Sequence, residues 1–164
     1  MLPPLAGRPI RVEIRRSLGP HHASTSIPRR RILMDAGVLT GRGEFERILI
    51  HEVFHFVWVR LSNRTRREWE SLLRAEIASG AAGELGWSAE WRKNALPPSR
   101  ASPRTPYLRT GRWRRYVCES FCDTAAWLYA GIRSHDEFTL QSRARNRRRG
   151  WFRLHFPGDA VLLM

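Results

Sequence analysis

Residues 48–59 read Ile-Leu-Ile-His-Glu-Val-Phe-His-Phe-Val-Trp-Val, an apolar run interrupted by two histidines and one glutamate. Wound as a helix, the run is apolar nearly all round, so we expect it to pass through the core. His51 and His55 are then one turn apart on the same face, where two imidazoles can bind one zinc ion. Without such a partner, burying these groups would be costly. The stretch therefore predicts a core helix from Glu44 to Leu61 that carries a metal site.

Glu52 lies between the two histidines and suits the role of a general base. It is about 100° round the helix from His51, from where its carboxylate can reach a metal-bound water without becoming a ligand. Zinc lowers the pKa of such a water, and the carboxylate can take its proton. The spacing therefore indicates metal-assisted hydrolysis. The alternative is a pair of half-buried histidines satisfied by hydrogen bonds.

Zinc held by two histidines needs a further protein ligand, and residues 116–129 are the best source of one. Read as a helix, this stretch places Glu119 and Asp123 one turn apart, on a stripe that includes small residues and allows close helix packing. We expect Glu119 to be the third ligand and Asp123 to accept a hydrogen bond from a ligating histidine, His51. The alternative is an ordinary amphipathic helix with two surface acids.

His51-Glu52-x-x-His55, followed some sixty residues later by Glu119-x-x-x-Asp123, resembles the HExxH…ExxxD signature of gluzincin metallopeptidases. These are the thermolysin-like branch of the zincins, here in a minimal single-domain form. The resemblance covers about forty residues in two helices. It implies the two histidines and Glu119 as zinc ligands, Glu52 as general base and Asp123 as the orienting acid. It also implies a zincin-like α+β fold, with a small N-terminal sheet packed on a helical bundle.

Two other histidines compete with Glu119 for the metal. His135 is expected in the first turn of a helix capped by Ser134, whereas His155 lies in an aromatic-rich segment that suits packing at the edge of the core. Either could instead stabilise the transition state. A tyrosine hydroxyl could also do so, and Tyr116 is better placed for this than Tyr107.

Cys118 and Cys122 flank Glu119 and suggest a mixed Cys/His zinc site. On a helix we expect them to point about 80–100° away from Glu119, and the chain has no further cysteine to complete a set. Their spacing is also poor for a disulfide. We therefore expect both to be small buried packing residues.

The chain carries a net charge of +14 with a pI of about 11.5, which is typical of proteins that bind polyanions. Of its 29 basic residues all but Lys93 are arginine. A GC-rich coding bias explains that ratio but not the excess over 15 acids. Nucleic acid could be bound by the densest basic cluster, which comprises Arg143, Arg145, Arg147, Arg148 and Arg149. The alternative is a solvated helix face.

The length predicts a single domain over residues 1–164, mainly strands and loops in 1–42 and mainly helical in 43–164. Strands are expected at Arg8–Arg16 and Arg30–Asp35, with a loop at Gly19–Pro28 between them. Val38–Leu39 is either a third strand or the lead into a turn. Further helices are expected at Arg66–Ser79, at Ser88–Lys93 with Ser88 as N-cap, and at Asp136–Arg149, and an irregular loop at Leu96–Pro106.

The sequence shows no apolar run long enough to span a membrane and no secretory signal, and its two cysteines are not expected to pair. We therefore expect a cytoplasmic protein. The leading hypothesis is a zinc-dependent peptidase acting on peptides or proteins. The alternatives are a non-catalytic regulatory or nucleic-acid-binding module with structural zinc, and a metal-dependent hydrolase of nucleic acid.

Overall fold

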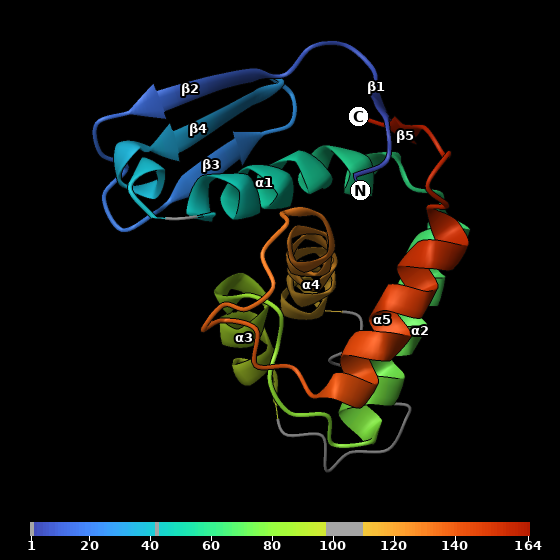
Figure 1. The fold of residues 1–164 in the computed structure, drawn as a ribbon. Coiled ribbons are helices and arrows are strands. Elements are labelled where there is room, and N and C mark those ends of the chain that lie inside the picture. The colour runs from blue at the N-terminus through green and yellow to red at the C-terminus, as the bar shows by residue number, and fades with distance from the viewer. Residues whose placement is uncertain (1, 42, 98–109) are drawn as a thin grey trace.

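The computed structural model describes residues 2–41, 43–97 and 110–164. Within them the fold is α+β, as predicted: a small sheet lies over one long helix, and the other helices lie on the far side of that helix (Figure 1). In chain order the elements are β1 (Leu5–Ala6), β2 (Arg11–Arg15), β3 (Ala23–Ser26), β4 (Arg31–Asp35), the 3-10 helix η1 (Ala36–Leu39), α1 (Glu44–Arg60), α2 (Asn63–Ala78), α3 (Trp87–Asn94), α4 (Gly111–Tyr129), α5 (Ser142–His155) and β5 (Leu162–Leu163).

β4 is the central strand of the main sheet, whose order is β2-β4-β3. β2 pairs with β4 in parallel, with Val12 opposite Ile32, and β3 pairs antiparallel, with Ala23 opposite Met34. Ile32 and Met34 are fully buried and pack against Phe56 of α1. The predicted strands at β2 and β4 are therefore confirmed. In β4 the alternating apolar residues are buried against α1, whereas Val12 and Ile14 of β2, an edge strand, are 42% and 45% exposed. β1 and β5 form a separate parallel pair that joins the two ends of the chain.

The prediction of a loop at 19–28 is wrong, because β3 lies inside it. Its sequence Ala-Ser-Thr-Ser has no apolar alternation, so the strand is specified by main-chain pairing with β4 and not by side-chain burial. Residues 38–39 belong to η1, which begins where the Asp35 carboxylate accepts a hydrogen bond from Gly37 N at 2.8 Å. They form no third strand because this cap turns the chain directly after β4.

The prediction of α1 is confirmed to within one residue. α2 starts three residues earlier than predicted, because Ser62 caps it by accepting a hydrogen bond from Thr65 N at 3.0 Å. α4 extends the predicted helix by several residues at its start, where Thr110 is the N-cap. α4 packs across α1 (Figure 1), and this crossing sets the geometry of the candidate site.

Two helix predictions need correction. α3 is capped at Gly86 and not at Ser88, and Ala89 N donates instead to the Asp123 carboxylate at 2.9 Å. α5 covers 142–155 and not 136–149, and Ser134 caps no helix. The amides of Thr139 and Leu140 donate to Glu84 O, which holds this segment out of a helix.

A cluster of aromatic residues forms the main core between α1, α2, α4 and α5, built around Phe54, Trp69, Phe121, Trp151 and Phe152. The irregular loop predicted at 96–106 lies mostly outside the described residues. In the described part of the chain, no helix has the length and apolar character needed to cross a membrane.

Candidate metal centre

The His-Glu-Val-Phe-His motif lies in the middle of α1, on the side that faces α4. The rings of His51 and His55 lie one turn apart in an edge-to-face arrangement, with centroids 5.0 Å from each other. Phe54 points to the opposite side and packs on Phe121 in the aromatic core. The helix is therefore anchored by its apolar face while it presents both imidazoles to α4.

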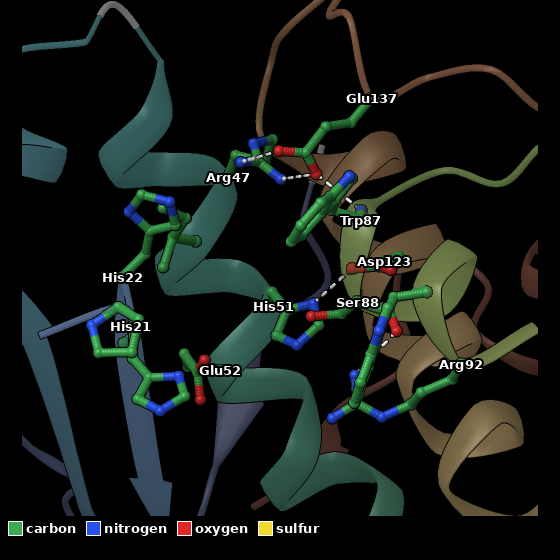
Figure 2. Close-up of a pocket in the computed structure, with 14 residues that line it drawn as sticks. His21, His22, Arg47, His51, Glu52, Trp87, Ser88, Arg92, Asp123 and Glu137 are labelled. Atoms are coloured by element: carbon green, nitrogen blue, oxygen red, sulfur yellow. Dashed lines mark hydrogen bonds and ion pairs between the residues drawn. The ribbon is translucent and has the colours of Figure 1, made fainter. Parts of the chain in front are cut away.

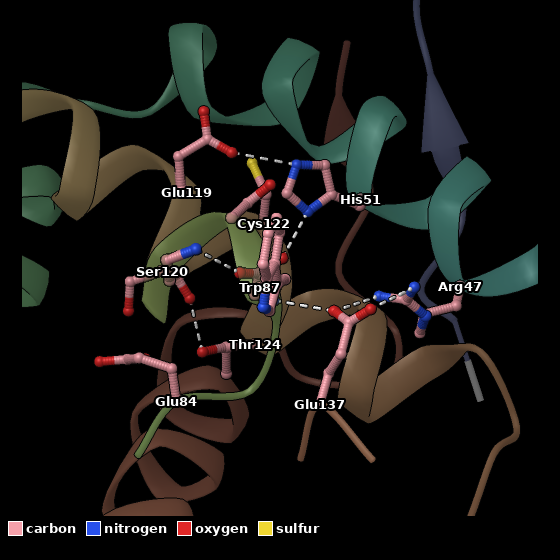
Figure 3. Close-up of polar contacts among 12 residues, drawn as sticks. Arg47, His51, Glu84, Trp87, Glu119, Ser120, Cys122, Thr124 and Glu137 are labelled. Carbon is pink, nitrogen blue, oxygen red and sulfur yellow. Dashed lines mark hydrogen bonds and ion pairs between the residues drawn. The ribbon is translucent and has the colours of Figure 1, made fainter. Parts of the chain in front are cut away.

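His51 lies between two carboxylates of α4, that of Glu119 (Figure 3) and that of Asp123 (Figure 2). Its Nδ1 is 2.7 Å from Asp123 Oδ1, which is the contact expected from the sequence, and its Nε2 is 3.2 Å from Glu119 Oε2. Burial disfavours the imidazolium, but Asp123 and Glu119 outweigh it and hold the pKa of His51 well above its usual value. Since Asp123 also accepts the amide of Ala89, its carboxylate is fixed in place from two sides.

The Nδ1 atom of His55 contacts the sulfur atoms of two cysteines on α4. This nitrogen lies 3.5 Å from the Sγ atoms of both Cys118 and Cys122, and the Nε2 of His55 lies 4.0 Å from Glu119 Oε2. Both histidines therefore have their Nδ1 occupied by a neighbouring group, and both turn Nε2 towards the same carboxylate oxygen. A ligating histidine is commonly fixed in this way by an acceptor on its second nitrogen.

Glu119 is held by its other oxygen as well. Arg92 of α3 places Nη2 3.2 Å from Glu119 Oε1. Burial raises the pKa of Glu119, but His51, His55 and Arg92 lower it below the usual value, which favours the carboxylate that a metal would need. The structure thus brings together the three residues that the sequence predicts as ligands.

Cys122 offers a competing donor. Its sulfur and one nitrogen each of His51 and His55 lie within 4.8 Å of one another, a spacing that could hold a metal. The expectation that Cys122 points about 80–100° away from Glu119 is wrong, because a separation of three residues amounts to only about 60° on a helix. Cys122 is fully buried, so its sulfur lies in the core, whereas Cys118 and Glu119 line a cleft together with the two histidines.

That cleft is bounded by α1, α3, α4 and the segment containing β3 (Figure 2). It consists of two adjoining cavities of about 370 and 490 Å³. Glu52 and His51 line both cavities, and each is only 9% exposed. A group bound in the cleft would therefore meet the carboxylate of Glu52 beside the imidazole of His51.

Other predicted site residues lie elsewhere. Tyr116 is fully buried, and its hydroxyl donates to Glu84 Oε1 at 2.7 Å, so its assignment as an oxyanion donor is wrong. It is about 60° round the helix from Glu119 and so points into the core. Burial, together with the charge of Glu84 and the hydrogen bond to it, raises the pKa of Tyr116 well above its usual value. Tyr107 lies outside the described residues.

The alternative histidine ligands are also excluded by their contacts. His135 Nε2 contacts a carboxylate oxygen of Glu44, and its Nδ1 accepts a hydrogen bond from the Glu137 amide at 3.2 Å. His155 Nε2 lies 3.3 Å from Glu68 on α2. Neither residue lines the cleft, so the expectations that His135 or His155 act there are wrong.

The basic cluster on α5 does not form one exposed surface. Arg148 is fully buried between Glu76 and Glu84, and Arg145 donates to the carbonyl oxygens of Phe138 and Leu140. Arg148 is therefore wrong as a nucleic-acid contact, because the fold uses its charge internally. Of the remaining cluster members, Arg143 is exposed and Arg147 and Arg149 are partly buried.

Sequence reasoning missed the wall of the cleft that α3 provides. Trp87 and Trp91, four residues apart, are 69% and 63% exposed and line the cleft together with Arg92. Their helical spacing was visible in the sequence, but exposed and buried tryptophans have the same spacing. Comparisons with protein-family models, with curated proteins and with solved structures found no match to this chain. Its function is therefore inferred from the geometry of the site.

Proposed function

We propose that this chain is a zinc-dependent peptidase of the gluzincin type, with a zincin-like fold. In this proposal His51, His55 and Glu119 hold the metal, and Glu52 is the general base. One observation carries it: both imidazoles are held at Nδ1 and turn Nε2 towards Glu119 Oε2, at 3.2 and 4.0 Å.

The separation of His51 from Glu119 matches that of two zinc ligands. Two nitrogen or oxygen ligands of a tetrahedral zinc, each about 2.0–2.1 Å from it, are separated by about 3.3 Å. The distance from His51 Nε2 to Glu119 Oε2, 3.2 Å, lies near this value, and that from His55 Nε2, 4.0 Å, is longer. The Glu119 set is preferred to the Cys122 set because it borders the cleft, and a catalytic zinc keeps one position for water.

When bound, zinc would polarise the scissile carbonyl and lower the pKa of the attacking water. Glu52 would take the proton from that water and later pass it to the leaving amine. Asp123 would keep His51 in the ligating orientation. β3 is an edge strand that lines the cleft, so its main chain could pair with an extended peptide.

A second candidate function is supported by Cys122. If the metal were held by His51, His55 and Cys122, its third ligand would lie in the core and the site would be structural. The chain would then be a regulatory or nucleic-acid-binding module, for which the net charge of +14 provides attraction to a polyanion.

Replacing Glu52 by glutamine tests the proposal. We expect Glu52→Gln to retain about one zinc per chain and to lose hydrolysis of a fluorogenic peptide library by a factor of about 10² or more, since it removes only the base. Glu46→Gln, an exposed acid on the same helix, should match the parent. If Glu52→Gln cleaved peptides as fast as the parent, the general-base assignment would be wrong. Cleavage of a labelled oligonucleotide but no peptide would refute the peptidase assignment.

A further inference from the structure

Arg92 is the cation of α3 that reaches the candidate metal centre. Its Nη2 is 3.2 Å from Glu119 Oε1, and its Nη1 donates to Ser88 O at 2.8 Å. The side chain is 25% exposed and lines both cavities of the cleft (Figure 2). The guanidinium is thus fixed at one end to its own helix and faces the cleft beside the carboxylate.

Arg92 also has unused hydrogen-bonding capacity. A guanidinium carries five N–H donors, and the contacts to Glu119 and Ser88 use two of them. Its Nε is buried and has no hydrogen-bond partner among the described residues. Because that nitrogen is not accessible, a ligand in the cleft would meet the remaining N–H groups on Nη1 and Nη2. Arg92 is therefore equipped to bind a further acceptor.

The other arginine of the cleft, Arg47, is less suited to this task. Arg47 is already held by Glu44 and by both oxygens of Glu137. Its charge is therefore balanced by two carboxylates. Glu137 in turn accepts the amide of Trp87, which ties this ion pair to the far end of the cleft.

We propose that Arg92 stabilises the negative charge that develops on the carbonyl oxygen of the scissile peptide bond; this rests on the proposed peptidase function. The oxygen of water bonds to the carbonyl carbon, the water proton moves to Glu52, and the carbonyl π electrons move onto its oxygen. The C–N bond then breaks, and Glu52 gives the proton to the leaving nitrogen. A preorganised cation beside that oxygen favours the transition state over the bound substrate.

A purely structural role for Arg92 makes a different prediction. If the guanidinium only holds Glu119 Oε1 in place, its loss would weaken the retention of zinc. It would not weaken the binding of an anionic transition-state mimic once the metal is saturated. The two roles are therefore separated by measuring metal affinity and mimic affinity independently.

The test compares the zinc-loaded parent with Arg92→Met and Arg92→Lys, by calorimetric titration with N-phosphoryl-leucinamide and with imidazole, a neutral metal ligand. Zinc affinity is measured separately by competition with a chromophoric chelator. Arg143→Met, which removes one exposed charge on α5, is the matched control. Thermal unfolding checks that each variant folds.

For Arg92→Met at saturating zinc we expect phosphoryl-leucinamide affinity and kcat to fall by about 10²-fold or more. The affinity for imidazole, measured with the site saturated with zinc, should stay within about threefold of the parent. Arg92→Lys should recover part of the loss because it keeps the charge, and Arg143→Met should behave as the parent. Unchanged mimic binding in Arg92→Met would overturn the proposal, as would a loss that zinc saturation removes.

The same measurements distinguish failure of the peptidase proposal from failure of the role proposed for Arg92. A parent that neither cleaves peptides nor binds the mimic when zinc-loaded would overturn the peptidase proposal and, with it, the role of Arg92. A parent that cleaves peptides alongside an equally active Arg92→Met would overturn only the role of Arg92.

Discussion

The carboxylate of Asp123 serves two elements at once. One oxygen faces His51 Nδ1 at 2.7 Å, and the other accepts the Ala89 amide at 2.9 Å near the start of α3. Since the side chain is almost completely buried, neither contact can be replaced by bulk water. Asp123 therefore couples the orientation of a candidate ligand to the position of the helix that forms the cleft wall.

Substituting Asp123 by asparagine should weaken zinc binding while the fold is retained. The amide keeps the shape but loses the charge that orients the imidazole and raises its basicity, so we expect zinc affinity to fall about 10–100-fold. Competition with a chromophoric chelator measures this. Asp136→Asn, at an exposed acid, provides the control. Parent-like zinc affinity in Asp123→Asn would show that His51 does not depend on this carboxylate.

At the scale of elements, the approach of α3 to α4 depends on Gly86. A Cβ added there would lie 2.3 Å from the carboxyl carbon of Asp123, far inside van der Waals contact. Its backbone is extended, with φ at 179°, so the requirement for glycine is steric and not conformational. Gly86 thus lets the N-terminus of α3 reach the carboxylate that holds His51.

Gly86→Ala should therefore destabilise the protein by about 1–3 kcal/mol, as overpacking does elsewhere, and should weaken zinc binding by displacing Asp123. Denaturant unfolding and the chelator assay measure the two effects. Gly150→Ala is the matched control, because a Cβ at that position of α5 meets no atom within 4 Å. It should be neutral or stabilising. A Gly86→Ala variant as stable as the parent would mean that α3 can shift at little cost.

Across the whole molecule, Arg148 links α5 to α2 and to the segment before α3. It forms ion pairs with Glu76 and Glu84 at 2.7 Å each, and all three side chains are almost completely buried. Burial raises the pKa of Glu84, but Arg148 and Lys93 outweigh it and lower the pKa below its usual value. For Glu76 burial prevails over Arg148, and the pKa is raised. The cation is therefore essential to keep Glu84 charged in the core.

Replacing Arg148 should lower the free energy of unfolding, by an amount that depends on pH. Arg148→Met leaves Glu76 buried without its cation and leaves Glu84 with only Lys93 and the Tyr116 hydroxyl, and we expect a loss of about 3–5 kcal/mol at neutral pH. The depressed pKa of Glu84 stabilises the parent above its unfolded pKa, and this contribution is lost as the pH falls through the folded value. In the variant, burial raises the pKa of both carboxylates and only Lys93 and Tyr116 oppose this at Glu84, so protonation of the two groups reduces the cost of the substitution as the pH falls.

The difference in unfolding free energy between parent and Arg148→Met should accordingly narrow from pH 7 towards pH 5. Urea unfolding at both values measures it, with Arg143→Met as the control for charge alone. A difference that is small at pH 7, or that widens in acid, would contradict the assigned role of the ion pairs.

The elements predicted correctly from the sequence are those whose own side chains carry the pattern, and the others depend on contacts with distant segments. The central parts of α1 and α4 and the strand β4 were predictable because their buried apolar residues recur with the period of a helix or a strand. β2 was predictable from the same alternation in the sequence, although its Val12 and Ile14 remain exposed at the edge of the sheet. The proximity of Glu119 to the two histidines was also expected, from spacing alone. β3 and the start of α5 could not be predicted, because main-chain hydrogen bonds to distant segments specify them. The positions of the Tyr116 and Arg92 side chains depend on how α4 and α3 are rotated and packed, which the local sequence does not encode.

The ligand environment of bound zinc tests the central claim most directly. X-ray absorption of the zinc-loaded protein, together with the metal content, reports both the number of ions and their donor atoms. We predict one zinc per chain with two imidazoles and oxygen donors at about 2.0–2.2 Å, and the loss of this signature in Glu119→Ala. A sulfur shell at about 2.3 Å, retained in Glu119→Ala and lost in Cys122→Ser, would contradict the catalytic site and assign the metal to the Cys122 set.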